Sequence, residues 1–158
     1  MGTLLAQAGL RLAIAESCTG GLLGHRITNI AGASNYFLGG VIAYAYEAKV
    51  QLLGVRWETL NRCGAVSRET VIEMAQGVRL RLGADIGLAI SGIAGPGGGT
   101  PEKPVGLTWI GLSALGFEQA QACIWPGDRQ AVKAQAAEQA LRLLLDYLAA
   151  QPAGGLLP

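Results

Sequence analysis

Apolar and polar residues alternate along the chain with two periods, one typical of buried strands and one typical of amphipathic helices. Short apolar runs predict strands at residues 12–15, 37–44, 86–90, 105–115 and 118–125. Between them, apolar residues recur at helical spacing and predict helices at residues 4–8, 19–30, 47–53, 57–62, 68–82 and 129–149. This succession of strands and helices predicts an α/β fold, a three-layer α/β/α domain.

Individual residues mark several ends of these elements. Ser67 predicts a helix N-cap, supported by Glu69 in the first turn, and Gly83 predicts the glycine that follows a helix C-terminus. Gly116 and Phe117 predict a hairpin turn between the last two strands, which would make these two antiparallel. The expected sheet is therefore mixed and mostly parallel.

A chain of 158 residues is long enough for one domain with a substantial core. We expect that domain over residues 1–151 and a flexible tail over residues 152–158, where proline and glycine follow the last helix. Half of the residues (51%) are hydrophobic and only 15% are charged, which excludes intrinsic disorder.

The charge balance and the rare residue types exclude several classes of partner and of functional site. A net charge of +1 provides no electrostatic attraction to nucleic acid or to an anionic membrane, and neither is expected as a partner. Polar residues interrupt the longest uncharged stretch, residues 27–46, so it predicts no membrane span, and no signal peptide is visible. Three widely spaced cysteines and a single histidine, His25, predict reduced thiols, no metal site and a cytoplasmic protein.

The first cluster of candidate chemistry follows the first predicted strand, at residues 16–21. If Ser17 lies at a helix N-terminus, free backbone N–H groups there favour developing negative charge, and Gly20 and Gly21 allow a ligand to approach the backbone. The alternative is that Ser17 or Thr19 only caps the helix. Cys18 is a further candidate nucleophile, because helix N-termini lower the pKa of thiols.

The second cluster is the pair Tyr44 and Lys49, at a junction between a strand and a helix. A lysine acts as a base only when neutral, and an apolar environment lowers its pKa from about 10.4 toward neutrality. Ser–Lys pairs replace the Ser–His–Asp arrangement in some hydrolases, and a chain with one histidine requires such an alternative. The competing interpretation is a surface lysine and a tyrosine with its hydroxyl in water.

The third cluster is the glycine-rich segment 92–99, followed by residues 100–104. Successive backbone N–H groups in such a loop can bind an anion, although a mobile connection would have the same composition. Arg129, at the start of the last helix, adds a side chain that binds phosphate bidentately. A solvated arginine at a helix start is the ordinary alternative.

Together these clusters resemble the CinA C-terminal domain family over nearly the whole chain. The resemblance rests on six segments in the right order: residues 15–21 (AESCTGG), 30–34 (IAGAS), 64–67 (GAVS), 91–96 (SGIAGP), 103–106 (KPVG) and 127–129 (GDR). Stand-alone members of this family are nicotinamide mononucleotide (NMN) amidohydrolases. The resemblance therefore implies an α/β/α fold and hydrolysis of NMN to nicotinate mononucleotide and ammonia, without a metal or another cofactor. It also implies a homodimer.

The resemblance implies roles for individual residues. Ser17 matches the nucleophile of the family and Lys49 its base, with Tyr44 close to both. The positions expected to relay protons or bind substrate are Thr19, Gly20, Gly21, Ser34, Ser91, Gly92 and Arg129. One departure is visible, because family members often have Ser-Asn where this chain has Ala45-Tyr46.

The expected mechanism is an acyl-enzyme route. Neutral Lys49, directly or through Tyr44, would take the proton of Ser17, and backbone N–H groups of residues 19–21 would stabilise the oxyanion. Arg129 and the glycine loop would hold the 5′-phosphate. Two alternatives stay open: a nucleotide-binding module that has lost turnover, and an interaction protein linked to competence or recombination.

Overall fold

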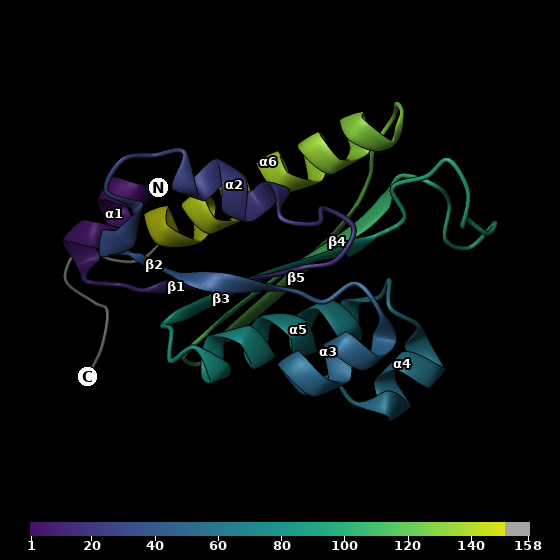
Figure 1. Cartoon of the computed structure of the whole chain (residues 1–158), viewed down its shortest axis with the longest axis horizontal. Helices are drawn as coiled ribbons and strands as arrows, with labels where there is room; N and C mark the ends of the chain where they lie inside the picture. Colours follow the sequence, from purple (N-terminus) through teal and green to yellow (C-terminus); the bar gives the residue numbers. More distant parts are fainter. Residues whose placement is uncertain (151–158) are drawn as a thin grey trace.

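The computed structural model describes residues 1–150, which form one five-stranded sheet with helices on both faces (Figure 1). The elements, in chain order, are α1 (Gly2–Ala8), β1 (Leu12–Glu16), α2 (Leu22–Thr28), the 3₁₀ helix η1 (Ala33–Asn35), β2 (Phe37–Ile42), α3 (Tyr46–Leu53), α4 (Trp57–Cys63), α5 (Arg68–Arg81), β3 (Ile86–Gly92), β4 (Leu107–Ala114), β5 (Phe117–Ile124) and α6 (Arg129–Ala150). The predicted tail, residues 152–158, lies outside the described residues.

The sheet has the strand order β2-β1-β3-β4-β5. Strand β1 pairs in parallel with β2 and β3, whereas β4 is antiparallel to both β3 and β5. Four strands therefore run in one direction and β4 runs in the other, which confirms the predicted α/β fold with a mixed sheet. The carboxyl ends of β1, β2 and β3 meet at one edge of the sheet, on the right in Figure 1.

The two faces of the sheet carry side chains of different size. Helices α1, α2 and α6 cover one face, where they pack on large residues such as Leu12 and Ile14. Helices α3, α4 and α5 cover the other face, where β1 presents Ala13 and Ala15. Because these side chains are small, α5 lies unusually close to the strands: a Cβ atom on Gly87 would lie 2.0 Å from the carbonyl oxygen of Ala75.

The two predicted markers of helix ends are confirmed, whereas the predicted hairpin turn is wrong by one residue. The Ser67 hydroxyl accepts a hydrogen bond from the Thr70 N–H (3.2 Å), as a helix N-cap should, and Gly83 has the positive φ of 60° expected after a helix. The hairpin turn consists of Leu115 and Gly116 rather than Gly116 and Phe117, because Ala114 pairs with Phe117.

Two further boundaries matter for the site. The predicted strand at residues 86–90 continues to Gly92, so Ser91 belongs to β3 rather than to the glycine loop. The predicted helix at residues 19–30 starts only at Leu22, because Gly20 and Gly21 adopt positive φ angles of 60° and 101°. Residues 17–21 are therefore a turn between β1 and α2.

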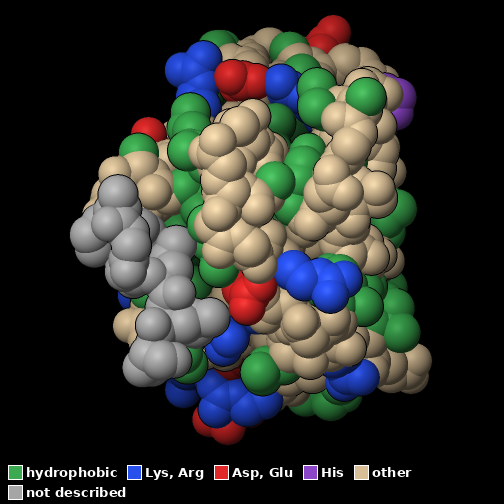
Figure 2. Space-filling model, turned by 90° about the vertical axis from the view of Figure 1, so that its left-hand side faces the viewer, with side chains coloured by type: hydrophobic (Ala, Val, Ile, Leu, Met, Phe, Trp, Pro, Cys, Tyr) green, Lys and Arg blue, Asp and Glu red, His purple; other side chains and the backbone are tan. Residues whose placement is uncertain are grey.

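The outer surface carries charges of both signs. On the face seen in Figure 2, lysine and arginine side chains are interspersed with aspartate and glutamate, in keeping with the net charge of +1. No helix within residues 1–150 is long and apolar enough to cross a bilayer.

The contact between α5 and α3 makes a testable prediction. Replacing a helix-interior glycine by alanine normally stabilises a helix by about 0.5–1 kcal/mol. A Cβ on Gly77 of α5, however, would lie 1.8 Å from the carbonyl oxygen of Leu53. We expect Gly77→Ala to lower the free energy of unfolding by about 1–3 kcal/mol in denaturant titrations.

Gly24→Ala is the matched control for Gly77→Ala. Its new Cβ would meet only side-chain ends, the Ile14 methyl at 3.3 Å and a carboxylate oxygen of Glu16 at 3.6 Å, so this variant should be close to neutral. Equal effects of the two substitutions would show that the backbone contact between α3 and α5 does not limit stability.

Candidate active site

Six of the ten predicted site residues line one cavity of about 250 Å³ at the carboxyl edge of the sheet. They are Ser17, Tyr44, Lys49, Ser91, Gly92 and Arg129. The end of β1, the segment after β2, helix α3, the end of β3 and the start of α6 each contribute to it. These elements are far apart in the sequence and converge because parallel strands end at the same edge.

Lys49 is fully buried, and its amine lies 3.1 Å from the hydroxyl oxygen of Ser17. The same amine donates to the carbonyl oxygens of Ala43, at 2.8 Å, and Tyr44, at 3.0 Å. A neutral amine has two N–H donors and one lone pair. With both donors on the carbonyls, the lone pair is left for the proton of the Ser17 hydroxyl.

Burial lowers the pKa of Lys49 from 10.5 to about 8, because the protonated amine loses its hydration in the interior. Roughly a tenth of the molecules then carry a neutral lysine at pH 7, far more than for an exposed lysine. The geometry and the lowered pKa are together those of a general base next to a serine nucleophile.

Cys18 also lines the cavity, but its thiol is a poor nucleophile. Burial raises the pKa of Cys18 from 9.0 to about 11, so the thiolate is scarce at neutral pH. Of the two neighbouring candidates, the contact with the Lys49 amine and the raised pKa of the thiol both favour Ser17.

The start of α2 differs from the prediction. Neither Ser17 nor Thr19 caps the helix, whose N-cap is Gly21 without a side-chain cap bond. Instead the carboxylate of Glu16 accepts the N–H group of Gly21 at 3.1 Å, and the Gly20 N–H donates to the carbonyl oxygen of Ser17. These N–H groups are therefore occupied and cannot bind an oxyanion as expected.

The remaining residues of this turn lie outside the cavity. Thr19, Gly20 and Gly21 are absent from its lining, and the buried Thr19 hydroxyl has no hydrogen-bond partner within the described residues. The N–H groups of Cys18 and Thr19 donate to no other residue of the described chain. Of these two residues, only Cys18 also lines the cavity.

Ser34 is not brought to the cavity. It lies in η1, before the start of β2, whereas Ser17 follows the end of β1. The register pairs Leu12 with Phe37 at one end of these strands and Glu16 with Ile42 at the other, so Ser34 and Ser17 lie at opposite edges of the sheet. The matching motif in the sequence contains no information about this separation.

Tyr44 has a different partner from the one expected. Its hydroxyl lies 3.1 Å from the guanidinium of Arg129, and only its backbone carbonyl contacts Lys49. Lys49 reaches Ser17 without an intermediate, so the proton path through Tyr44 is not needed.

The wall of the cavity includes a segment that we did not predict as part of the site. Ala65 and Val66, between α4 and α5, line the cavity, and the carbonyl oxygen of Ala65 accepts the Ser91 hydroxyl at 2.7 Å. The hydroxyl of Tyr46 accepts the N–H of Ala65 at 3.2 Å. The only signal in the sequence was the family motif at residues 64–67, which suggested no role.

Arg129 and the glycine loop form the outer part of the cavity. The guanidinium donates to the carbonyl oxygen of Gly95 at 2.8 Å. Gly95, Gly97 and Gly98 line the cavity, and their N–H groups donate to no residue in the described part of the chain. Free N–H groups beside a guanidinium suit an anion such as a phosphate.

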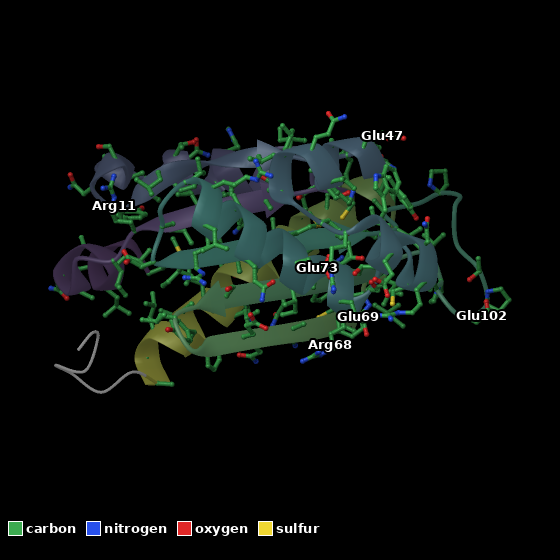
Figure 3. All side chains as sticks on the ribbon, turned by 90° about the horizontal axis from the view of Figure 1, so that it is seen from below. Arg11, Glu47, Arg68, Glu69, Glu73 and Glu102 are labelled. Atoms are coloured by element: carbon green, nitrogen blue, oxygen red, sulfur yellow. The ribbon has the colours of Figure 1, made fainter. Side chains whose placement is uncertain are left out.

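A wider groove of about 550 Å³ lies against α5, on the side covered by α3, α4 and α5. Its main charged pair, Arg56 and Glu73, is satisfied internally, and no serine, cysteine or lysine lines it. Figure 3 shows Glu73 on this helix-covered face. No group of three or more His, Cys, Asp or Glu side chains among residues 1–150 is placed to hold a metal ion.

Comparison with known proteins agrees with this description. The CinA C-terminal domain family matches residues 1–148. A putative competence-damage inducible protein of Moorella thermoacetica is 53% identical over 150 residues, which are 95% of this chain and 36% of that protein. A CinA-like protein of Kosmotoga olearia is 54% identical over 138 residues, 87% of this chain and 34% of that protein.

Solved structures extend the likeness to the fold. A CinA superfamily protein of Klebsiella pneumoniae has a TM-score of 0.91 and 40% identity, and the match covers 94% of this chain and 93% of that one. The chain spans only about a third of the length of the curated relatives that it matches.

The buried lysine makes the stability of the fold depend on pH. Because the pKa of Lys49 is lower in the folded chain than in the unfolded one, the unfolded chain binds more protons between about pH 8 and 10.5. Lys49 therefore contributes most stability above that window and loses the contribution progressively as the pH falls from about 10.5 to 8. We expect the free energy of unfolding of the wild type, relative to Lys49→Met, to rise by about 1–3 kcal/mol from pH 8 to pH 10.

Denaturant titrations at several pH values would measure this difference, and the Lys49→Met reference cancels the contributions of other titrating groups. A difference independent of pH would mean that the amine of Lys49 keeps its ordinary pKa in the folded protein.

Proposed function

The chain belongs to the CinA C-terminal domain family, and we propose that it hydrolyses the carboxamide of NMN to nicotinate mononucleotide and ammonia. The observation that carries this proposal is the buried contact of 3.1 Å between the Lys49 amine and the Ser17 hydroxyl, at the floor of a cavity with free anion donors. A nucleophile, a base and a phosphate site together suit an amide attached to a nucleotide.

In the first half of the reaction, Ser17 is acylated. Neutral Lys49 takes the proton as the Ser17 oxygen attacks the carboxamide carbon, which forms a tetrahedral intermediate. Lys49, now protonated, gives the proton to the amide nitrogen, the C–N bond breaks and ammonia leaves. The carbonyls of Ala43 and Tyr44 keep the amine aimed at Ser17 throughout.

In the second half, water replaces ammonia. Neutral Lys49 takes a proton from the water, whose oxygen attacks the acyl carbon, and the proton returns to the Ser17 oxygen as the ester bond breaks. The oxyanion of both tetrahedral intermediates requires a donor, and the N–H group of Cys18, which follows Ser17 and lines the cavity, is the candidate. This assignment replaces the N–H groups of Gly20 and Gly21, which are occupied.

The substrate phosphate is assigned to the outer cavity. Arg129 and the N–H groups of the glycine loop would bind it, so that the carboxamide at the other end of the nucleotide reaches Ser17. Binding energy from the phosphate then positions the reacting group. The proposal concerns this domain alone, since the curated relatives are about three times as long.

The direct test is ammonia release from NMN by the purified protein in the presence of EDTA. We expect turnover in the wild type and a loss of at least about 1000-fold in Ser17→Ala and Lys49→Ala, because each variant lacks one partner of the proton transfer. Wild-type kcat/KM should increase with pH to a plateau, with an apparent pKa near 8, as Lys49 becomes neutral.

Other outcomes separate the alternatives. Turnover that persists in Ser17→Ala would contradict the nucleophile and direct attention to Cys18. Folded wild-type protein that binds NMN and releases no ammonia would be a nucleotide-binding module. If the folded protein neither binds nor hydrolyses NMN, the remaining alternative is an interaction protein linked to competence or recombination.

The phosphate assignment has its own test. In Arg129→Ala, KM for NMN should rise about 10- to 100-fold with a smaller change in kcat, since a charged hydrogen bond to the phosphate is lost. Nicotinamide riboside, which lacks the phosphate, should be a correspondingly poor substrate of the wild type and should be little affected by Arg129→Ala. Equal turnover of riboside and NMN would contradict the assignment.

A further inference from the structure

We infer that Glu16 is a positioning residue of the Ser17–Lys49 site, acting through the turn that carries Ser17. The inference rests on the proposed function for the roles of Ser17 and Lys49, and it adds a residue that neither touches the substrate nor lines the cavity. Glu16 is the last residue of β1, directly before Ser17, and only 2% of it is exposed.

The carboxylate of Glu16 organises the following turn. One of its oxygens accepts the N–H groups of Gly21 and Leu23, both at 3.1 Å, and the other accepts the N–H of Gly24 at 2.9 Å. Three bonds thus join the end of the strand to the first turn of α2. Ser17 lies within the segment that these bonds close, so the backbone is held in place both before Ser17, by β1, and after it, by α2.

The backbone of Glu16 connects the same point to the lysine. Its carbonyl oxygen accepts the N–H of Ala43 at 2.8 Å, and the carbonyl of Ala43 in turn accepts the Lys49 amine at 2.8 Å. The N–H of Ser17 donates to the carbonyl of Ile90 at 3.0 Å. Glu16 therefore connects Ser17, which follows it directly, to Ala43, whose carbonyl orients the amine of Lys49.

A carboxylate is suited to this place, whereas an amide is not. Three N–H donors converge on the side chain, and an ionised carboxylate offers only acceptors. Glutamine has the same shape, but its NH₂ group would face one of the donors. The carboxylate also lies at the positive end of α2 and occupies the N–H groups there, so these cannot bind the substrate phosphate. In the proposed function the phosphate is therefore bound by Arg129.

The molecule contains a matched control in Glu73 of α5. Its carboxylate also accepts a backbone N–H at a helix start, that of Arg56 before α4, at 2.9 Å, and it is bound by the Thr59 hydroxyl at 2.7 Å. It lines the groove against α5 and does not line the cavity. Figure 3 shows its place on α5. Glu73 is only partly buried and also forms an ion pair with the Arg56 guanidinium. Glu73→Gln therefore perturbs a carboxylate at a helix start that has no contact with Ser17.

The experiment compares Glu16→Gln and Glu73→Gln in two assays. The first is NMN hydrolysis, in which kcat of Glu16→Gln should fall about 10- to 100-fold while KM changes less than about 2-fold, because a misplaced Ser17 affects the chemical step and not the phosphate site. The second is labelling of Ser17 by a fluorophosphonate, in which an O–P bond forms, fluoride leaves and Lys49 takes the serine proton. Its rate should fall by a similar factor in Glu16→Gln.

Labelling at the wild-type rate in Glu16→Gln would overturn the inference. So would equal losses of rate in Glu16→Gln and Glu73→Gln, because the effect would then be a general one of stability. A wild type that is labelled at Ser17 but does not hydrolyse NMN would overturn the proposed substrate only, and the ratio of labelling rates would still decide the role of Glu16. A wild type that reacts with neither compound would overturn both proposals.

A second variant covers the case in which Glu16→Gln does not fold. Gly21→Ala keeps the carboxylate but strains the same turn, since Gly21 has a φ of 101° and its Cβ would lie 3.3 Å from the Ile42 side chain. We expect the same fall in kcat and in labelling rate at nearly unchanged KM. Wild-type rates in this variant would contradict a dependence of Ser17 on the turn.

Discussion

Burying the amine of a lysine removes it from water, and the rest of the site depends on how the fold compensates for that loss. Lys49 is fully buried, yet each hydrogen-bonding direction of its amine has a partner: two carbonyls of the segment after β2 and the hydroxyl of Ser17. The same burial lowers the pKa to about 8. One physical effect thus costs stability near neutral pH and supplies the neutral amine that a base requires.

The position of the Lys49 amine beside Ser17 requires close packing between the sheet and the layer formed by α3, α4 and α5. Small residues such as Ala15 and Gly87 let α5 approach the strands, and Gly77 lets the end of α3 at Leu53 approach α5. Lys49 lies one turn before Leu53 on α3. The small residues of this face therefore determine how far the lysine reaches toward the strand end, whereas the large residues of the other face supply most of the core.

The local parts of this arrangement were predictable because their signals are local. Apolar periodicity predicted the strands and helices, and Ser67 and Gly83 marked the ends of α5 by their own hydrogen bond and φ angle. The predictions were wrong where a hydrogen-bond partner outside the local pattern determines the conformation or the contact. The Glu16 carboxylate accepts the N–H group of Gly21, and the Arg129 guanidinium donates to the hydroxyl of Tyr44. No local pattern in the sequence predicts these two hydrogen bonds.

The sequence by itself therefore determined the α/β fold, the family and the residue types available for chemistry, since periodicity and motifs are properties of neighbouring positions. Only the tertiary structure decided which of those residues meet. It joined Ser17 to Lys49 across 32 positions of sequence, added Ala65 and left Ser34 at the opposite edge of the sheet. The physical reason is that strand order and register bring together residues distant in sequence, and burial then determines their protonation.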